Sequence, residues 1–150
     1  MQLSQFTDYA LRTLMLTALN TDRRTTIEEV ATTYGISKEH VRKVVHQLTR
    51  LGFLEGTRGR GGGLRLAMPA EAIRIGDVVR GTETNFAMAE CLRRERDRAL
   101  GGGCPIDGVC RLTGMLRGAA NAFLAELDRH TLADAVANRP ALLTRLTPAA

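Results

Sequence analysis

Residues 26–68 carry the pattern that most restricts what this chain can fold into: two short amphipathic helices followed at once by a glycine-rich hairpin. The first helix is predicted to begin after Thr26, because Thr26 and Glu29 have the spacing of a capping box. Gly35 is typical of the position just past a helix end. The second helix is predicted to begin after Ser37, a favourable N-cap residue. Two helices joined by so short a turn predict a helix-turn-helix unit.

The second helix of this unit is predicted to have a buried face and a basic face. At 100° per residue, its aliphatic side chains share one side: Val41, Val44, Val45, Leu48 and Leu51. The opposite side carries Glu39, Arg42, Lys43, His46 and Arg50. The N-terminal end of a recognition helix makes most of its contacts to DNA bases. We therefore predict DNA contacts from Ser37, Lys38, His40, Arg42, Lys43 and His46.

A β-hairpin is predicted over residues 53–68, with strands at 53–58 and 64–68 around a glycine-rich tip. A hairpin directly after a recognition helix forms the wing of a winged-helix domain. Arg58 and Arg60 flank a glycine in the tip, where the backbone can approach a groove closely. We predict that these two arginines contact DNA phosphates or the minor groove.

The positive charge of the chain is concentrated in this same segment. The whole chain has 21 Lys and Arg against 16 Asp and Glu, a net charge of +5. Residues 36–66 contain seven of the basic residues and two of the acidic ones, which accounts for the entire excess. Charge concentrated on one supersecondary unit indicates nucleic-acid binding more strongly than a basic average does. The alternative is a solvated helix face, since Glu39 and Lys43 have the spacing of a stabilising ion pair.

Further helices are predicted on both sides of this unit. One spans residues 3–19, a short one 73–79, and a long one 111–129. Another short helix is expected after Thr131, and the chain from Pro140 onward is expected to be loosely ordered. The long helix has a stripe too apolar to face solvent, which predicts that it packs against a second copy of the chain: Leu112, Met115, Leu116, Ala119, Phe123 and Leu127.

Together these elements predict a mainly α fold with a small β-hairpin: a winged helix-turn-helix domain plus a long dimerisation helix. The predicted divisions are a DNA-binding domain at 1–82, a cysteine-containing loop at 83–110, dimerisation and short C-terminal helices at 111–137, and a tail at 138–150. The sequence has no apolar run of about 18 residues and no secretory signal, which predicts a cytoplasmic protein without a membrane span. It contains no nucleotide-binding or hydrolase motif, so we predict that it is not an enzyme.

The three cysteines, Cys91, Cys104 and Cys110, lie in one glycine-interrupted stretch. An odd number of cysteines in a cytoplasmic chain argues against a disulfide framework. The spacing lacks the close cysteine pairs of most zinc sites, and irregularly spaced thiols on a glycine-rich loop suit an iron–sulfur cluster better. Zinc binding and redox-active thiols remain alternatives. Three thiolates leave one iron of a four-iron cluster without a protein ligand, so a fourth ligand must come from elsewhere, such as a partner chain.

Several segments of the chain resemble the nitric-oxide-sensing NsrR repressors, which belong to a winged-helix regulator family that also includes RirA and IscR. The resemblance covers about residues 1–137. It rests on the segments Met1–Arg12, Tyr34–His40, Arg58–Leu64, Ile75–Arg80 and Thr131–Asp134. Residues Phe86–Cys91 also resemble RirA sequences, whereas Asp8 favours the NsrR group.

That resemblance implies a homodimer whose two winged helices bind an inverted-repeat operator in double-stranded DNA. It implies an iron–sulfur cluster, 4Fe–4S or 2Fe–2S, bound by Cys91, Cys104 and Cys110, so that residues 83–110 form a cluster-binding loop. In the NsrR pattern an aspartate of the other subunit, here Asp8, completes the cluster, and Arg12 lies in its surroundings. The implied function is a repressor that loses its affinity for DNA when nitric oxide attacks the cluster.

Three other functions are compatible with the residues. An iron-responsive repressor of the RirA type would release DNA when iron is scarce. A zinc-bound or cluster-free DNA-binding module would be colourless. An electron-transfer or cluster-carrier protein with an incidental basic face would bind DNA weakly, without sequence preference and with a steep salt dependence. In such proteins Asp8 would only stabilise the N-terminus of its helix.

Overall fold

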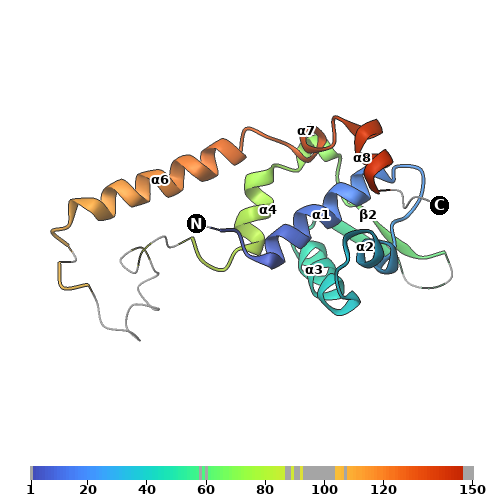
Figure 1. Ribbon diagram of the computed structural model, residues 1–150, viewed down its shortest axis with the longest axis horizontal. Coiled ribbons are helices and arrows are strands. Elements are labelled where there is room, and N and C mark those ends of the chain that lie inside the picture. The colour runs from blue at the N-terminus through green and yellow to red at the C-terminus, as the bar shows by residue number, and fades with distance from the viewer. Residues whose placement is uncertain are drawn as a thin grey trace.

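The computed structural model describes residues 2–57, 59, 61–86, 89, 92, 104–106 and 108–146. Its elements follow in the order α1 (Gln5–Leu19), α2 (Ile27–Tyr34), α3 (Lys38–Arg50), β1 (Leu54–Thr57), β2 (Gly63–Leu66), the 3-10 turn η1 (Ala70–Ala72), α4 (Ile75–Thr82), α6 (Arg111–Leu127), α7 (Leu132–Ala135) and α8 (Arg139–Leu146). The two-stranded sheet lies at one edge of a group of helices (Figure 1). The predicted fold class, mainly α with a small hairpin arranged as a winged helix, is confirmed.

The helix-turn-helix is fixed by the caps that the sequence predicts. Thr26 Oγ1 accepts a hydrogen bond from the Glu29 amide at 3.1 Å, and the Glu29 carboxylate accepts one from the Thr26 amide. Gly35 ends α2 in the left-handed conformation, at φ 63°. Ser37 Oγ accepts from the His40 amide at 3.3 Å, which satisfies one free amide at the start of α3. The turn between α2 and α3 therefore has a defined conformation at both ends.

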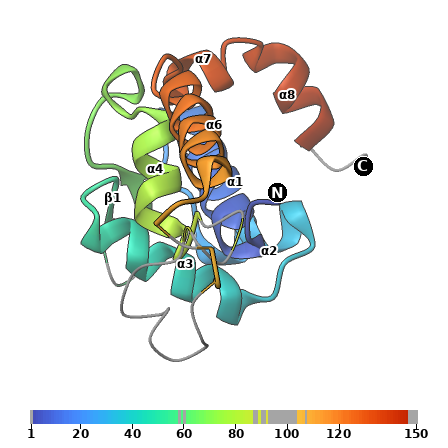
Figure 2. The same ribbon diagram turned by 90° about the vertical axis from the view of Figure 1, so that its left-hand side faces the viewer.

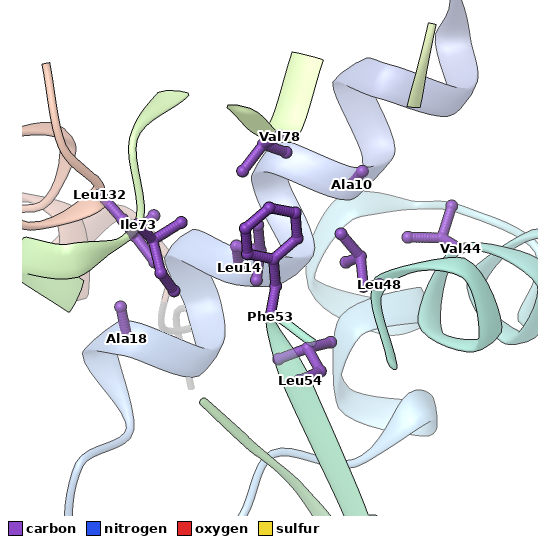
Figure 3. Packing of buried hydrophobic residues seen from close by; sticks show 10 residues of the cluster. All are labelled: Ala10, Leu14, Ala18, Val44, Leu48, Phe53, Leu54, Ile73, Val78 and Leu132. Carbon is purple, nitrogen blue, oxygen red and sulfur yellow. The ribbon is translucent and has the colours of Figure 1, made fainter. Parts of the chain in front are cut away.

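The main core lies between α1, α3, the hairpin and α4 (Figure 3). Its buried members are Ala10, Leu14, Ala18, Val44, Leu48, Phe53, Leu54, Ile73, Val78 and Leu132. Val44 and Leu48 belong to the predicted buried face of α3 and are fully buried. Burial of a side chain of this size contributes about 1.5–3 kcal/mol. The back of α3 is thereby held in the core, and its other face is left at the surface.

A second cluster joins α2 to α1 and α3, and the C-terminal helix packs on it. The buried members of this cluster are Leu16, Val30, Ala31, Ile36 and Val41. Leu146 of α8 packs against them, and Arg139 Nη2 donates to Thr21 Oγ1 at 3.5 Å. The expectation of a loosely ordered tail is therefore wrong for residues 140–146, which belong to α8. Pro140 is compatible with a helix there because it lies in the first turn, where a missing amide costs no hydrogen bond.

The hairpin pairs in antiparallel register, from Leu54 opposite Leu66 to Thr57 opposite Gly63. Its strands are shorter than predicted, at four residues each. Thr25 extends this ladder: its amide donates to the Leu64 carbonyl at 3.0 Å, and its carbonyl accepts from the Leu64 amide at 2.7 Å. Backbone bonds therefore tie the wing to the chain just before α2.

The short helix predicted at 73–79 begins later, at Ile75, and continues to Thr82 as α4. Arg80 of α4 reaches across to the end of α6, where its Nη1 and Nη2 lie 2.6 and 2.5 Å from the two Asp128 carboxylate oxygens. This guanidinium lowers the pKa of Asp128. Gly76 leaves room for the pair, because a Cβ at this position would lie 1.9 Å from Asp128 Oδ1. α4 and the C-terminal end of α6 are thus joined by a bidentate ion pair.

α6 projects away from the packed body of the chain (Figures 1 and 2). None of its 17 residues is buried. Leu112 and Met115, two members of the predicted apolar stripe, are 56% and 66% exposed. The N-terminal part of the stripe therefore lacks a cover within the described part of one chain, whereas Phe123 and Leu127 nearer its C-terminal end are half-buried. No described helix combines the length and the apolar character that a membrane crossing requires.

Candidate nucleic-acid interface and metal ligands

The exposed face of α3 gathers most of the predicted DNA contacts on one surface. The side chains of Lys38, Arg42 and Lys43 are 52%, 59% and 64% exposed. His40 and His46 are exposed as well. Because the aliphatic residues of α3 lie in the core, these polar side chains occupy the side that a DNA groove can reach. Arg58 and Arg60, the predicted wing contacts, lie outside the described residues.

Carboxylates accompany the basic side chains of this face. Lys38 Nζ lies 2.5 Å from Glu28 Oε2 of α2, and the Glu39 carboxylate lies 3.5 Å from Arg42 and 4.0 Å from Lys43. Exposed ion pairs of this kind contribute only about 0–1 kcal/mol. A phosphate oxygen can therefore replace these carboxylates at little cost. The ion pair between Glu39 and Lys43, which the sequence analysis gave as an alternative to DNA binding, exists. Its distance of 4.0 Å leaves Lys43 available to another anion.

α1 supports the N-terminal end of α3. The Tyr9 and His40 rings lie 6.2 Å apart, and the Arg12 guanidinium lies 5.8 Å from the Tyr34 ring centroid. Burial raises the pKa of the Tyr34 phenol, although the charge of Arg12 opposes that effect. The aromatic rings therefore hold the turn between α2 and α3 against α1. Ser37, the first predicted contact, uses its hydroxyl as a helix cap, so its contact to DNA stays a prediction.

The root of the wing requires glycine at position 63. Gly63 has a φ of 153°, and a Cβ there would lie 2.9 Å from Arg24 Cβ and 2.9 Å from the Thr25 carbonyl oxygen. A real Cβ would therefore push β2 away from Thr25. Gly56 in the opposite strand differs, because a Cβ there would make an ordinary 3.6 Å contact with Leu64 Cδ2.

Replacing Gly63 with alanine is expected to destabilise the domain by about 1–3 kcal/mol, since the new methyl group breaks the two backbone bonds between Thr25 and Leu64. Urea denaturation followed by circular dichroism measures this change. Gly56→Ala is the matched control in the same hairpin and should stay close to wild type. Equal midpoints for the two variants would contradict the close approach at Gly63.

Asp8 and Arg12 form an ion pair one turn apart on α1. Arg12 Nε lies 3.0 Å from Asp8 Oδ1, and Arg12 Nη2 lies 2.9 Å from Asp8 Oδ2. Each side chain is 45% exposed, so the pair can be reached from outside the chain. Because Arg12 holds both carboxylate oxygens, Asp8 has to release at least one of these bonds before it can bind a metal. Asp8 also lies in the first turn of α1, where a carboxylate stabilises the helix dipole.

Two of the three predicted cysteine ligands are described. Cys104 and Cys110 are both half-buried, and Cys91 lies outside the described residues. Cys110 is the N-cap residue of α6, at the end where the helix dipole stabilises a thiolate. Gly108 turns the chain between them with a φ of 83°. Soft thiolate donors at a helix N-terminus fit an iron–sulfur cluster.

The structure does not bring Asp8 and the two cysteines together within one chain. α6 carries its N-terminal end, with Cys110, away from the body that contains α1 (Figure 1). Among the described residues, no group of three His, Cys, Asp or Glu side chains is close enough to hold a metal ion. Within the described part of one chain, Asp8 therefore does not form a ligand set with Cys104 and Cys110.

Two contacts near the basic face have no counterpart in the sequence analysis. Glu28 of α2 binds Lys38, and Gln47 Nε2 of α3 donates to the Gly81 carbonyl at 3.1 Å. Each joins residues of two different elements, so neither produces a recognisable local pattern in the sequence. The only indication of the second is that Gln47 is a polar residue next to the aliphatic face of a predicted helix.

Comparison with known proteins identifies relatives along nearly the whole chain. Residues 3–138 match the Rrf2 family, which is described as "Iron-dependent Transcriptional regulator". The HTH-type transcriptional regulator NsrR of Bacillus subtilis (strain 168) is 43% identical over 147 residues, which cover 97% of each chain. The protein of the same name from Geobacillus kaustophilus is 44% identical, with the same coverage. These relatives are named as transcriptional regulators and not as enzymes, in agreement with the prediction.

Solved structures with a similar fold are also regulators by name. The global cysteine regulator CymR of B. subtilis superposes with a TM-score of 0.69 at 23% identity, over 92% of this chain and 98% of the other. T. potens IscR superposes with a TM-score of 0.72 at 18% identity, over 92% and 88%. At these identities the superpositions establish the fold.

Proposed function

This chain belongs to the Rrf2 family of iron-dependent transcriptional regulators, and we propose on that basis that it is a cytoplasmic, homodimeric repressor with an iron–sulfur cluster that senses nitric oxide. The observation that carries the DNA-binding part is the exposed basic face of α3, with Lys38, Arg42 and Lys43 beside a wing. The identity of about two fifths with NsrR proteins supports the choice of nitric oxide as the signal.

The proposed dimer is supported by the uncovered stripe of α6. A helix of 17 residues is about 25 Å long, and exposed apolar surface of that extent marks an interface. Two crossed α6 helices would bury the stripe of one chain against that of the other. The same dimer would present two α3 helices to an inverted repeat, whose half-sites lie roughly 34 Å apart in successive major grooves.

In this proposal Cys91, Cys104 and Cys110 hold the cluster, and Asp8 of the partner subunit supplies the fourth ligand. When bound, the cluster supplies iron that reacts with nitric oxide. A carboxylate binds iron less strongly than a thiolate, so Asp8 would be the ligand that the cluster loses most easily. Arg12 lies ready to take the released carboxylate, because it contacts both oxygens in the single chain. Without the Asp8 link the two subunits would be free to rotate, and their α3 helices would no longer match successive major grooves.

The second candidate is an iron-responsive repressor. The description of the matching family as iron-dependent is the observation that favours it. The same residues would bind the cluster. The repressor would release DNA when a shortage of iron causes the cluster to be lost. The two candidates differ only in which chemical acts first.

A gel-shift assay under anaerobic conditions distinguishes these signals. The probe is an inverted-repeat duplex that cluster-loaded protein selects from a random pool. Stoichiometric nitric oxide is expected to release this duplex within minutes, before an iron chelator does. Release by the chelator first would favour the iron-responsive repressor, and unchanged binding after nitric oxide would overturn the proposed signal. A duplex of scrambled sequence controls for nonspecific binding, which is weaker and falls steeply with salt.

A further inference from the structure

The last turn of α4 contacts the recognition helix directly. Gln47 Nε2 of α3 donates to the Gly81 carbonyl at 3.1 Å, across 34 residues of sequence. Gly81 also lies against Leu51, the residue that follows α3, because a Cβ at position 81 would lie 2.6 Å from Leu51 Cδ1. The carbonyls of a last helical turn lack partners within the helix. Gln47 satisfies one of them and so fixes α3 to α4.

The same turn is bonded to the start of α1. Thr7 Oγ1 donates to Thr82 Oγ1 at 2.9 Å, and both side chains are buried. The Ser4 amide donates to Glu83 Oε1 at 2.6 Å. We call Gly81, Thr82 and Glu83 the α4 joint. An open pocket of about 510 Å³ lies where α1, α3 and this joint meet.

The place of the α4 joint in the sequence relates these bonds to the cysteines. Its last residue, Glu83, is the first residue of segment 83–110, so the joint connects that segment to the body beside α3. Gln47 lies one turn after Lys43 on α3, and the two therefore share one side of that helix. A shift passed to Gln47 accordingly moves Lys43, one of the proposed DNA contacts.

We propose that Gln47 is a positioning residue that couples the cysteine-containing segment to the recognition helix through the Gly81 carbonyl. This inference rests on the proposed function for its biological meaning, although the joint itself is made of described contacts. Gln47 needs no contact with DNA in this role. It determines how far α3 follows a movement of the segment after α4.

The affinity arm of the test compares cluster-loaded with cluster-free protein on the selected duplex by fluorescence anisotropy. The affinity ratio of the wild type is expected in the range typical of allosteric coupling, about 5- to 150-fold. Gln47→Met keeps the length of the side chain but removes the donor, and should lower this ratio by about 2- to 10-fold, the effect of one hydrogen bond. Thr49→Met places the same residue on the exposed side of α3 and should leave the ratio unchanged. A purely structural Gln47 would weaken both states equally, and an unchanged ratio in Gln47→Met would overturn the coupling role.

The second arm of the test uses cluster-free protein, so it examines the α4 joint independently of the proposed sensing function. Glu83→Ala removes the acceptor of the Ser4 amide, and hydrogen exchange of the α3 amides is measured in cluster-free protein. Glu83→Ala alone should make hydrogen exchange of the α3 amides faster than in the wild type. In protein that already carries Gln47→Met, adding Glu83→Ala should cause no further change. Unchanged exchange after Glu83→Ala would contradict the joint. If the wild type binds DNA equally with and without a cluster, the proposed sensing function fails, and this arm still decides whether the joint couples α4 to α3.

Discussion

Lys43→Glu is expected to lower the affinity for the selected duplex at least about 100-fold. A charge-assisted hydrogen bond contributes about 1.5–3 kcal/mol, and the substitution removes one from each of the two α3 helices of a dimer. Lys43 is 64% exposed, and its nearest carboxylate, Glu39, lies 4.0 Å away, so the substitution removes little that stabilises the fold. Fluorescence anisotropy at several salt concentrations measures the effect. The dependence of log affinity on log salt should also become shallower by about one unit for each phosphate that the variant no longer neutralises.

Arg129→Glu provides the matched control for this charge reversal. Arg129 is 75% exposed and lies just after α6, away from α3. The control changes the net charge by the same amount and should retain most of the affinity. Equal reductions of affinity in the two variants would mean that only the overall charge matters, and α3 would then not be the DNA-reading element.

Met115→Glu is expected to convert the protein from dimer to monomer. Met115 is 66% exposed in the single chain, and a pair of buried carboxylates in the proposed α6 interface would lack partners. Sedimentation velocity should give half the mass of the wild type at micromolar concentration. Affinity for the inverted repeat should fall toward that for a single half-site, because the two heads no longer bind together.

Asn121→Glu is the control for the α6 substitution. At 100° per residue, Asn121 lies on the side of α6 opposite the apolar stripe, so its carboxylate should remain in solvent in the dimer. This variant should sediment as the wild type does. A dimeric Met115→Glu protein would contradict the assignment of the stripe as the interface.

The helices of the winged-helix domain can be predicted from the sequence, because capping residues determine where each one begins and ends. The Thr26 capping box, the left-handed Gly35 and the Ser37 cap each act within four residues, so the sequence alone predicts them. The buried face of α3 follows from the helical period, as Val44 and Leu48 illustrate. Leu51 departs from this pattern: it lies just past the end of α3 and is 36% exposed.

The sequence does not predict the features that depend on contacts between distant parts of the chain. α8 is stabilised by the contact of Leu146 with a cluster more than a hundred residues earlier in the chain, so its own short sequence gives little indication of a helix. The Glu28 to Lys38 ion pair and the Gln47 to Gly81 hydrogen bond likewise join elements whose relative placement is unknown before folding. All of the proposed DNA contacts and metal ligands stay predictions, and Arg58, Arg60 and Cys91 also lie outside the described residues.

The described candidate metal ligands lie in two separate parts of the fold. Cys104 and Cys110 lie near the start of a helix that leaves the body, whereas Asp8 lies within the body on α1. The sequence predicts each donor but not their separation, which only the fold of α6 reveals. This separation supports the proposal that Asp8 of a second subunit, the ligand that the NsrR resemblance implies, completes the site.

Anaerobic purification followed by absorbance spectroscopy and by iron, sulfide and zinc analysis tests most directly whether residues 83–110 hold an iron–sulfur cluster. A brown protein with equal amounts of iron and acid-labile sulfide is expected, and Cys110→Ser should lose both while α1 to α4 remain folded. A colourless protein with stoichiometric zinc, or with no metal after anaerobic reconstitution, would contradict the proposed sensing function and leave a DNA-binding module without a cluster.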